Sequence, residues 1–319
     1  MKATAIAPSN IAFIKYWGKK DEDKKIPDNN SISMNLSDLT TTTTVEFGSQ
    51  YAEDSVVIND GIDDIQSRRV IKHLDLIRKK SGLKLRAKVV SINNFPDGTG
   101  LSSSASGFAA LTLSATKAAG LNLDEKELSI LARLGSGSAC RSIPDGFVEW
   151  VGESAKSLYS PDYWNIVDVV SIVSSDKKEI SSTDGQKFAK TSPFFQTRLN
   201  NINEKIAQFK KALKSKNFTE FGEIVESEAL ELHAIMLTST PSLIYFQPET
   251  IMMMKWVKKW RNEGLEVYFT VNTGQDIHLI VEEKNREKLI KKLEEIKEIK
   301  KIIVNRPAVG ARLVEQHLF

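Results

Sequence analysis

The chain passes from a predicted strand into a predicted helix at Asn94-Phe95-Pro96-Asp97-Gly98-Thr99-Gly100-Leu101-Ser102-Ser103-Ser104-Ala105-Ser106-Gly107. Glycines let backbone N–H groups approach an anion closely, serines add hydroxyl donors, and a helix N-terminus carries about half a positive charge. The stretch has neither the Gly-Lys-Ser/Thr of a Walker loop nor the spacing Gly-x-Gly-x-x-Gly. It predicts either a phosphate-binding loop or an ordinary helix cap.

Short β-branched runs and helical patterns surround this loop in the first half of the chain. The predicted strands are 4–6, 41–47, 55–58, 85–92 and 166–173. The predicted helices are 63–81, 105–119 and 124–134, the last opening on an Asp-Glu-Lys-Glu capping pattern. The first half therefore predicts a sheet with helices packed against it.

The second half begins with longer helices and ends in alternating strands and helices. The predicted order is helices 192–214, 218–237 and 248–262, strand 266–271, turn 272–276, strand 277–281, helix 284–296 and strand 301–304. Strand, turn, strand and helix in this order predict an α+β layer of ferredoxin-like type. We expect the halves to meet in the polar stretch 177–192, and we divide the chain into domains 1–183 and 184–319.

Composition excludes several classes of protein. The 319 residues are 41% hydrophobic and 27% charged, which is typical of a globular chain with one large or two ordinary domains. The net charge of +3 is too small for a general nucleic-acid binder. A single cysteine, Cys140, excludes an intrachain disulfide and a cysteine zinc cage, and is expected to be buried. No apolar run approaches the ~20 residues that span a membrane. We expect a cytoplasmic protein without a nucleic-acid or membrane partner.

Three further segments carry candidate binding groups. Near the N-terminus, Ser9-Asn10-Ile11-Ala12-Phe13-Ile14-Lys15-Tyr16-Trp17-Gly18-Lys19 would place Lys15 and Lys19 on one side of an extended chain. Two converging ammonium groups suit a diphosphate, whereas snorkelling surface lysines are the plain alternative. In Gly135-Ser136-Gly137-Ser138-Ala139-Cys140-Arg141-Ser142, hydroxyls precede a guanidinium that can grip a carboxylate or phosphate. The third segment, 270–276, is as a bare pattern a turn between strands. The four histidines are scattered, and His233 and His278 are expected to be structural.

Taken together, these segments resemble the diphosphomevalonate decarboxylases of the GHMP kinase superfamily. The resemblance rests on five segments in the right order: 10–19, 29–33, 93–111, 132–150 and 233–245. It implies a two-domain α+β GHMP kinase fold. The N-terminal α/β domain would carry a phosphate loop in a left-handed type of βαβ unit, the C-terminal domain would be ferredoxin-like, and the active site would lie in the cleft between them.

The resemblance also implies a reaction and its cofactors. ATP, with Mg²⁺, would phosphorylate the 3-hydroxyl of mevalonate 5-diphosphate, and loss of phosphate and CO₂ would give isopentenyl diphosphate. Such enzymes serve isoprenoid biosynthesis in the mevalonate pathway, and dimers are common among them, so we expect a homodimer.

Residue roles follow from the same resemblance. The catalytic set would be Asn272, Lys15, Arg141 and Ser104, with Lys15 close to the reacting 3-oxygen. The substrate would be held by Tyr16, Lys19, Ser136, Ser138, Arg141 and Ser182. ATP would be held by Gly98, Gly100, Leu101, Ser102, Ser103, Ser104 and Ser106, and Ser104 would also bind the metal.

Two positions depart from the family pattern. The family carries an Asp, assigned as the base for the 3-hydroxyl, where this chain has Asn272, and a neutral amide cannot take a proton. Asp276 lies in the same turn but four residues on. Some members also carry an Arg where this chain has Thr183. Asn272 is either an engineered change, a natural change that slows phosphorylation, or the mark of a substrate already phosphorylated on the 3-oxygen. The alternative substrates are mevalonate 5-phosphate and mevalonate 3,5-bisphosphate. The alternative of another class is a catalytically dead homologue that only binds ligand.

Overall fold

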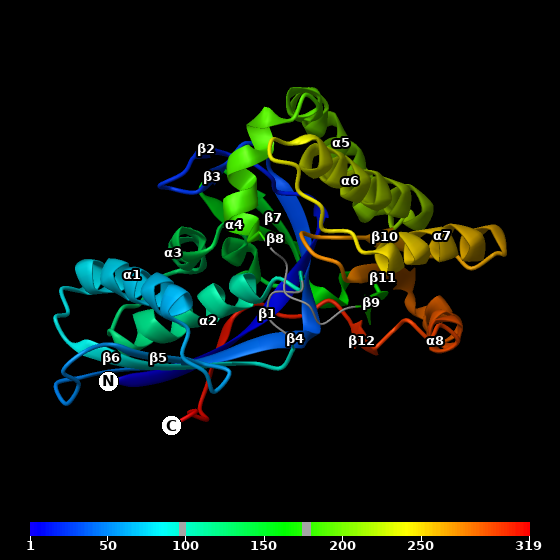
Figure 1. The fold of residues 1–319 in the computed structure, drawn as a ribbon. Coiled ribbons are helices and arrows are strands. Elements are labelled where there is room, and N and C mark those ends of the chain that lie inside the picture. Colours follow the sequence, from blue (N-terminus) through cyan, green and yellow to red (C-terminus); the bar gives the residue numbers. More distant parts are fainter. Residues whose placement is uncertain (96–99, 174–179) are drawn as a thin grey trace.

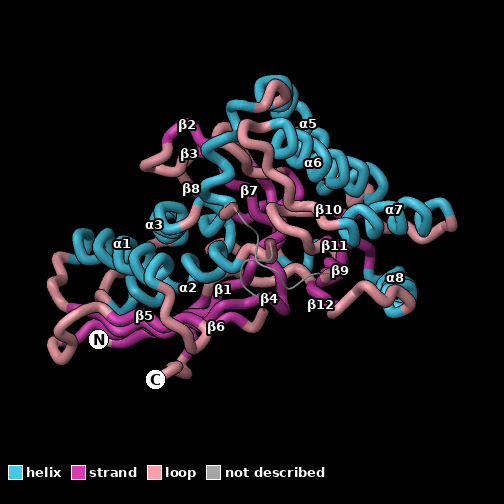
Figure 2. Tube along the Cα trace, in the orientation of Figure 1, coloured by secondary structure: helices cyan, strands magenta, loops and turns pink. Residues whose placement is uncertain are grey.

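The computed structural model describes residues 1–95, 100–173 and 180–319. It forms a mixed α+β fold in which a seven-stranded and a four-stranded sheet carry helices on their faces (Figures 1 and 2). Within the described residues, none of the helices is long and apolar enough to cross a membrane.

The larger sheet is built around two long strands that pair with each other. Its order is β13-β1-β4-β6-β5, and β7 joins it by pairing with both β4 and β8. The strands are β1 (Lys2–Ile14), β4 (Ser31–Gly48), β5 (Ser55–Ile58), β6 (Arg86–Asn93), β7 (Phe147–Val151), β8 (Ser154–Tyr159) and β13 (Arg312–Val314). A separate small hairpin joins β2 (Lys19–Asp21) and β3 (Ile26–Pro27). The pairing of β5 with β6 is parallel and runs through a crossover helix.

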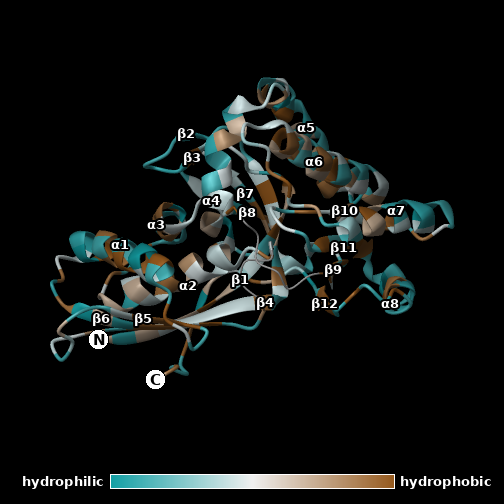
Figure 3. Cartoon of the chain, in the orientation of Figure 1, coloured by the Kyte–Doolittle hydropathy of each residue, from teal (hydrophilic) through white to brown (hydrophobic). Residues whose placement is uncertain are grey.

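Three helices cover one face of this sheet, and the capping pattern predicted at Asp124 is confirmed. They are α1 (Asp64–Ser81), α2 (Ser103–Ala118) and α3 (Glu125–Gly135). The Asp63 carboxylate accepts the N–H groups of Ile65 and Gln66 at the start of α1. Asp124 and Glu127 form a capping box at the start of α3. Apolar residues of the helices and the sheet form one core, and hydrophilic and hydrophobic segments alternate along α1 (Figure 3).

The smaller sheet has the strand order of a ferredoxin-like unit. The order is β10-β11-β9-β12, with every pairing antiparallel. Its strands are β9 (Ile166–Ile172), β10 (Tyr268–Thr270), β11 (Ile277–Glu282) and β12 (Lys301–Asn305). The helices of this half are α4 (Ser182–Gly185), α5 (Phe195–Ser215), α6 (Phe218–Thr238), α7 (Pro248–Asn262) and α8 (Arg286–Glu294). Short 3₁₀ turns are η1 (Gly137–Ser142), η2 (Pro161–Tyr163), η3 (Gln186–Thr191) and η4 (Glu283–Asn285).

The two halves share a core and exchange strands. One apolar cluster combines Phe13 of β1 with Val170 of β9, Phe209 of α5 and Phe221 of α6. Near the C-terminus, β13 returns to pair with β1 in the larger sheet. The division into domains 1–183 and 184–319 stays a prediction, although strand pairing places β9, which lies before residue 183, in the smaller sheet.

Local sequence signals missed parts of this fold. The strands β1 and β4 are much longer than the predicted 4–6 and 41–47, and β7, β8 and β13 were not predicted. The extended chain expected through Lys15 and Lys19 is also wrong, because β1 ends at Ile14 and Gly18 has a φ of 89°. A left-handed residue interrupts the alternation of side chains, so Lys15 and Lys19 meet different partners.

Candidate active site

The loop between β6 and α2 ends in a tight contact with the other half of the molecule. Gly100 has a φ of 109°, and a Cβ added there would lie 2.8 Å from the Cα of Gly274 in the turn between β10 and β11. Only glycine fits both the left-handed backbone and the close approach. The contact brings the start of α2 against the turn that carries Asn272. Gly98, predicted to bind ATP, lies outside the described residues.

The N-terminus of α2 has features that suit an anion. Ser102, the N-cap residue, has a φ of 60°, and its hydroxyl makes no capping hydrogen bond to the helix. The first turn of α2 contains no acidic residue. Because the first N–H groups of a helix have no acceptor within the helix, an uncapped start can bind phosphate oxygens.

The serines of the loop divide into two groups. Ser104 is exposed, and its hydroxyl lies 3.2 Å from the Ser136 hydroxyl, while Ser102 and Ser103 are half-buried. Ser106 points inward instead: it is fully buried and shares a 2.6 Å hydrogen bond with Thr41. The predicted contact of the Ser106 hydroxyl with ATP therefore has no support from its placement.

Leu101 also faces the interior. Its side chain is buried in the shared core, and its carbonyl accepts a 2.5 Å hydrogen bond from the Ser9 hydroxyl of β1. Leu101 thus anchors the loop to the sheet, and it offers a ligand no side-chain group that binds phosphate.

Lys15, just past the end of β1, reaches the turn that carries Asn272. Its ammonium donates to the Ala12 carbonyl at 2.6 Å and to Asn272 Oδ1 at 3.1 Å. The amide nitrogen of Asn272 donates to the Ser102 hydroxyl at 3.3 Å. One chain of hydrogen bonds therefore joins β1, the β10–β11 turn and the start of α2.

Burial controls the charge of Lys15. Its side chain is 1% exposed, and burial lowers its pKa to about 7, with Glu228 and Asp168 opposing the shift and Arg141 and Arg198 adding to it. No carboxylate contacts the ammonium among the described residues, since its polar partners are a carbonyl and an amide. Lys15 is therefore balanced between its charged and neutral forms near pH 7.

Arg141 is buried and held by neutral groups only. Its guanidinium donates to the hydroxyls of Ser31 and Ser33 at 2.6 and 3.0 Å and to Asn10 Oδ1 at 3.2 Å. Within the described residues it forms no ion pair with a carboxylate. A rigid cation that keeps its full charge can attract an anionic ligand.

Tyr16 and Arg141 both lie against Trp150, and Lys19 follows Tyr16 by three residues. The Tyr16 ring packs edge-on against Trp150 at 4.6 Å, and burial raises the pKa of its hydroxyl, which therefore stays neutral. A Cβ at Gly137 would lie 2.9 Å from that hydroxyl, so the 3₁₀ turn that carries Ser138 and Arg141 packs directly on Tyr16. Lys19 is buried and pairs with Glu22 at 2.6 Å.

Two further polar residues, Ser182 and Asp276, contact different partners at the turn between β10 and β11. The Ser182 hydroxyl of α4 bonds to the Thr273 hydroxyl beside Asn272. Asp276 is buried and accepts the backbone N–H of Val173 at 3.1 Å. Its carboxylate is thus engaged with the end of β9, whereas Lys15 contacts Asn272.

The histidines and the cysteine have structural surroundings, as the sequence predicts. His233 is buried, stacks on Phe246 at 3.8 Å and donates to the Asn272 carbonyl at 2.9 Å, and burial lowers its pKa to about 3. His278 contacts both oxygens of Asp168 at 3.0 Å. Cys140 is buried, and burial raises its pKa to about 12.

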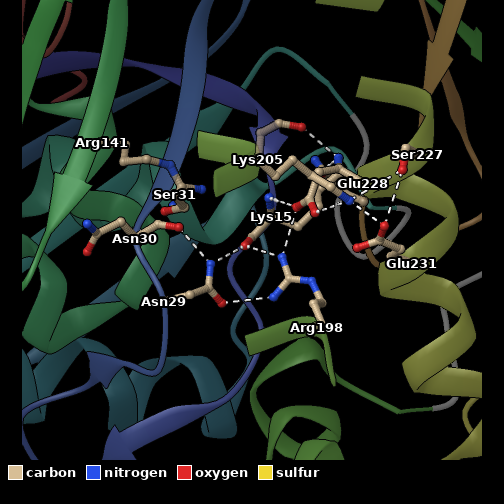
Figure 4. Close-up of polar contacts among 12 residues, drawn as sticks. Lys15, Asn29, Asn30, Ser31, Arg141, Arg198, Lys205, Ser227, Glu228 and Glu231 are labelled. Carbon is tan, nitrogen blue, oxygen red and sulfur yellow. Dashed lines mark hydrogen bonds and ion pairs between the residues drawn. The ribbon is translucent and has the colours of Figure 1, made fainter. Parts of the chain in front are cut away.

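Sequence reasoning missed the groups that bind the backbone of Lys15. The Lys15 backbone bonds to Glu228, Arg198 and Asn29, all buried (Figure 4). For Arg198 and Glu228 the local signal is a charge on the apolar face of a predicted helix, and both lie too far from Lys15 in sequence for a pattern to join them. Asn29 lies in the segment 29–33 that resembles the family, but no role was predicted for it.

A metal would find few protein ligands here. In the part of the chain that the structure describes, no group of three or more His, Cys, Asp or Glu side chains could hold a metal ion. Hydroxyls such as that of Ser104 are the available oxygen donors, and Mg²⁺ commonly keeps several waters and binds through substrate phosphates.

Known proteins of similar sequence share both halves of this architecture. The diphosphomevalonate decarboxylase-like N-terminal domain matches residues 7–159, and the mevalonate 5-diphosphate decarboxylase C-terminal domain matches residues 168–312. The chain belongs to the diphosphomevalonate decarboxylase family. The diphosphomevalonate decarboxylase of Candida albicans is 33% identical over 312 residues, covering 90% of this chain and 86% of its own length.

Solved decarboxylases have the same fold. The mevalonate diphosphate decarboxylase of Staphylococcus aureus is 36% identical, with a TM-score of 0.94 and 98% of each chain covered. A structure described as MDDEF in complex with MVAPP, AMPPCP and magnesium is 37% identical, with a TM-score of 0.93 and 99% of each chain covered. The family and the two-domain α+β fold expected from the resemblance are therefore confirmed, and the chain is an enzyme of the decarboxylase (lyase) class.

Proposed function

We propose that this enzyme uses ATP and Mg²⁺ to convert mevalonate 5-diphosphate to isopentenyl diphosphate, through phosphorylation of the 3-hydroxyl and loss of phosphate and CO₂. The observation that carries the proposal is the hydrogen-bonded chain from Lys15 through Asn272 to Ser102. Through Asn272 alone, this chain connects the start of α2, which suits phosphate, to the buried cation Lys15. The complex of a similar protein with MVAPP, AMPPCP and magnesium supports the same ligands.

The start of α2 would hold the nucleotide phosphates. Its uncapped N–H groups and the hydroxyls of Ser102, Ser103 and Ser104 suit phosphate oxygens, and the exposed Ser104 would also serve the metal. When bound, ATP supplies the phosphoryl group and Mg²⁺ neutralises its charge. The contact between Gly100 and Gly274 sets this helix end against Asn272.

The substrate would lie against the cations on the other side. Arg141 keeps its charge, because none of the carboxylates that the structure describes pairs with it, and Ser136 and Ser138 would add hydroxyls from the same segment. Ser182, which contacts Thr273, would add a hydroxyl from the side of Asn272. Tyr16 and Lys19 would hold the diphosphate, which would compete with Glu22 for the Lys19 ammonium. As an ammonium, Lys15 would stabilise negative charge on the 3-oxygen and the departing phosphate.

Asn272 would limit the rate at which the 3-hydroxyl is phosphorylated. Its Oδ1 accepts from Lys15 and its amide nitrogen donates to Ser102, so its orientation is fixed, and it cannot accept the 3-hydroxyl proton. We expect phosphorylation to proceed slowly. The same observation favours a second candidate, decarboxylation of mevalonate 3,5-bisphosphate, because a substrate that already carries the 3-phosphate needs no base. Mevalonate 5-phosphate remains the other candidate substrate, and a homodimer in the cytoplasm stays a prediction.

Product analysis of the wild type and Asn272→Asp tests the proposal. Each is incubated with mevalonate 5-diphosphate, 5-phosphate or 3,5-bisphosphate, with and without ATP and Mg²⁺. We expect ATP-dependent isopentenyl diphosphate only from the 5-diphosphate, and a gain of about 10²–10⁴-fold in turnover with Asn272→Asp, because a carboxylate can take the proton.

Other outcomes identify the alternatives. ATP-independent turnover of the 3,5-bisphosphate would replace our proposal with the second candidate. Binding without product, even in Asn272→Asp, would indicate a ligand-binding homologue. Asp276→Asn is the matched control: because Asp276 accepts from Val173, this change should leave the gain from Asn272→Asp in place.

A further inference from the structure

A buried ion pair between α5 and α6 encloses the backbone of Lys15 (Figure 4). Glu228 Oε2 accepts the Lys15 backbone N–H at 2.9 Å, and Arg198 Nη2 donates to the Lys15 carbonyl at 3.0 Å. The same Nη2 donates to Glu228 at 2.8 Å. The side chains of Arg198 and Glu228 are 3% and 0% exposed. The N–H and the carbonyl of Lys15 are thus hydrogen-bonded to Glu228 and Arg198, which also pair with each other.

Two neighbours fix this pair in turn. Asn29 donates to the Lys15 carbonyl at 2.9 Å and accepts from Arg198 Nη1 at 2.9 Å. Lys205 lies 3.3 Å from the second carboxylate oxygen of Glu228. Burial alone would raise the pKa of Glu228, but Arg198 and Lys205 hold it below its ordinary value, so Glu228 is a carboxylate.

The position of Lys15 explains why such support is needed. Lys15 directly follows the end of β1, where the pairing with β4 shifts register between Ala12 and Ile14. Among residues 1–95, 100–173 and 180–319, its backbone polar groups therefore have no strand partner. A buried ion pair contributes little net stability compared with apolar side chains of similar size, so stability alone is a weak reason for this one.

We propose that Arg198 and Glu228 are positioning residues that hold the Lys15 backbone so that its ammonium reaches Asn272 and the reacting oxygen. The inference rests on the proposed function, because Lys15 is the group that this function places at the reaction. The ion pair thus connects helices α5 and α6 to Lys15, which directly follows strand β1.

Charges from several elements face the Lys15 ammonium. Glu228 of α6 and Asp168 of β9 favour its charged form, whereas Arg141 of η1 and Arg198 of α5 oppose it. Removing Glu228 should therefore lower the pKa of Lys15, and removing Arg198 should raise it. These opposite shifts report the two charges beside Lys15, and the loss of kcat reports whether the pair also positions its ammonium.

The kinetic test compares two glutamates of the same helix. Glu228→Gln keeps an oxygen for the Lys15 N–H but loses the ion pair with Arg198. Glu226 is the matched control, since it pairs with Arg261 at 2.8 Å and accepts the backbone N–H of Phe269 at 3.2 Å, on a different side of α6 from the Lys15 contact of Glu228. Both changes are made in the wild type and in Asn272→Asp. We expect kcat to fall about 10–100-fold in Glu228→Gln with little change in KM, because a small misplacement of Lys15 is costly.

A second measurement does not depend on turnover. Lysine labelled with ¹³C at Cε is titrated by NMR, and the Lys15 signal is assigned by its absence from Lys15→Arg. The pKa of Lys15 should fall in Glu228→Gln, rise in Arg198→Gln and stay unchanged in Glu226→Gln. If the protein turns over none of the three mevalonate phosphates, the proposed function fails while this titration still tests the positioning.

Two results would overturn the inference. Equal losses of kcat in Glu228→Gln and Glu226→Gln would indicate a general structural effect, as would a Lys15 pKa that neither Glu228→Gln nor Arg198→Gln changes. If Glu228→Gln does not fold, Arg198→Gln carries both measurements, because Lys205 still pairs with the remaining carboxylate.

Discussion

The chemistry of the site depends on the pairing of Lys15 with Asn272. A carboxylate at position 272 would form an ion pair with the Lys15 ammonium, whereas the amide leaves that cation unneutralised. Burial then lowers the pKa of Lys15 to about 7. Under the proposed function, an amide at position 272 therefore leaves the site without a proton acceptor there and favours the neutral form of the neighbouring lysine.

The pH dependence of kcat/KM should report this effect. If the ammonium of Lys15 is the working form, activity falls as the pH rises through about 7. In Asn272→Asp the new carboxylate should raise the pKa of Lys15 by about 1–3 units and move the fall to higher pH. Activity that instead increases as the pH rises through 7 would show that neutral Lys15 is the working form.

At the scale of elements, the decisive contact is between the loop before α2 and the turn between β10 and β11. The strand before the loop, the helix after it and the turn could all be read from local sequence, because β-branched runs, caps and glycines are local signals. Their contact could not be read, since Gly100 and Gly274 belong to different halves of the chain.

Gly100→Ala tests this contact, with Gly82→Ala as the matched control. Both glycines have positive φ, at 109° and 72°, but a Cβ at Gly82 would meet nothing within 4 Å. Gly82→Ala should cost about 1 kcal/mol of unfolding free energy from backbone strain, and Gly100→Ala should cost more, because its Cβ would also meet the Gly274 backbone. Only Gly100→Ala should also weaken nucleotide binding, measured by calorimetry with ADP, because the loop must move away from Gly274. Equal nucleotide affinity in the two variants would contradict this role.

At the scale of the whole molecule, buried histidines couple stability to pH. Burial lowers the pKa of His73 and His233 to about 3 each. His73 bonds through Nε2 to Thr112 at 2.8 Å, and its buried Nδ1 has no hydrogen-bond partner among the described residues. Between the unfolded pKa of about 6.5 and the folded value, the unfolded chain binds more protons. Stability is therefore full above pH 6.5 and is lost as the pH falls toward 3.

Urea unfolding at pH 7, 6 and 5 checks this coupling. Below pH 6 each histidine should remove up to about 1.4 kcal/mol of unfolding free energy per pH unit. His73→Gln should therefore show a shallower fall than the wild type. Identical pH dependence in the two proteins would mean that His73 is protonated without unfolding.

The family, the order of most helices and strands, and most of the residues that meet at the site could be read from the amino-acid sequence. These follow from local patterns and from segments that match a known family. The folded chain was needed to show that Ser106 faces the core, that Asp276 contacts Val173, and that Arg198 and Glu228 hold Lys15. The reason is physical: each depends on burial and on contacts between elements far apart in the chain, which no local periodicity encodes.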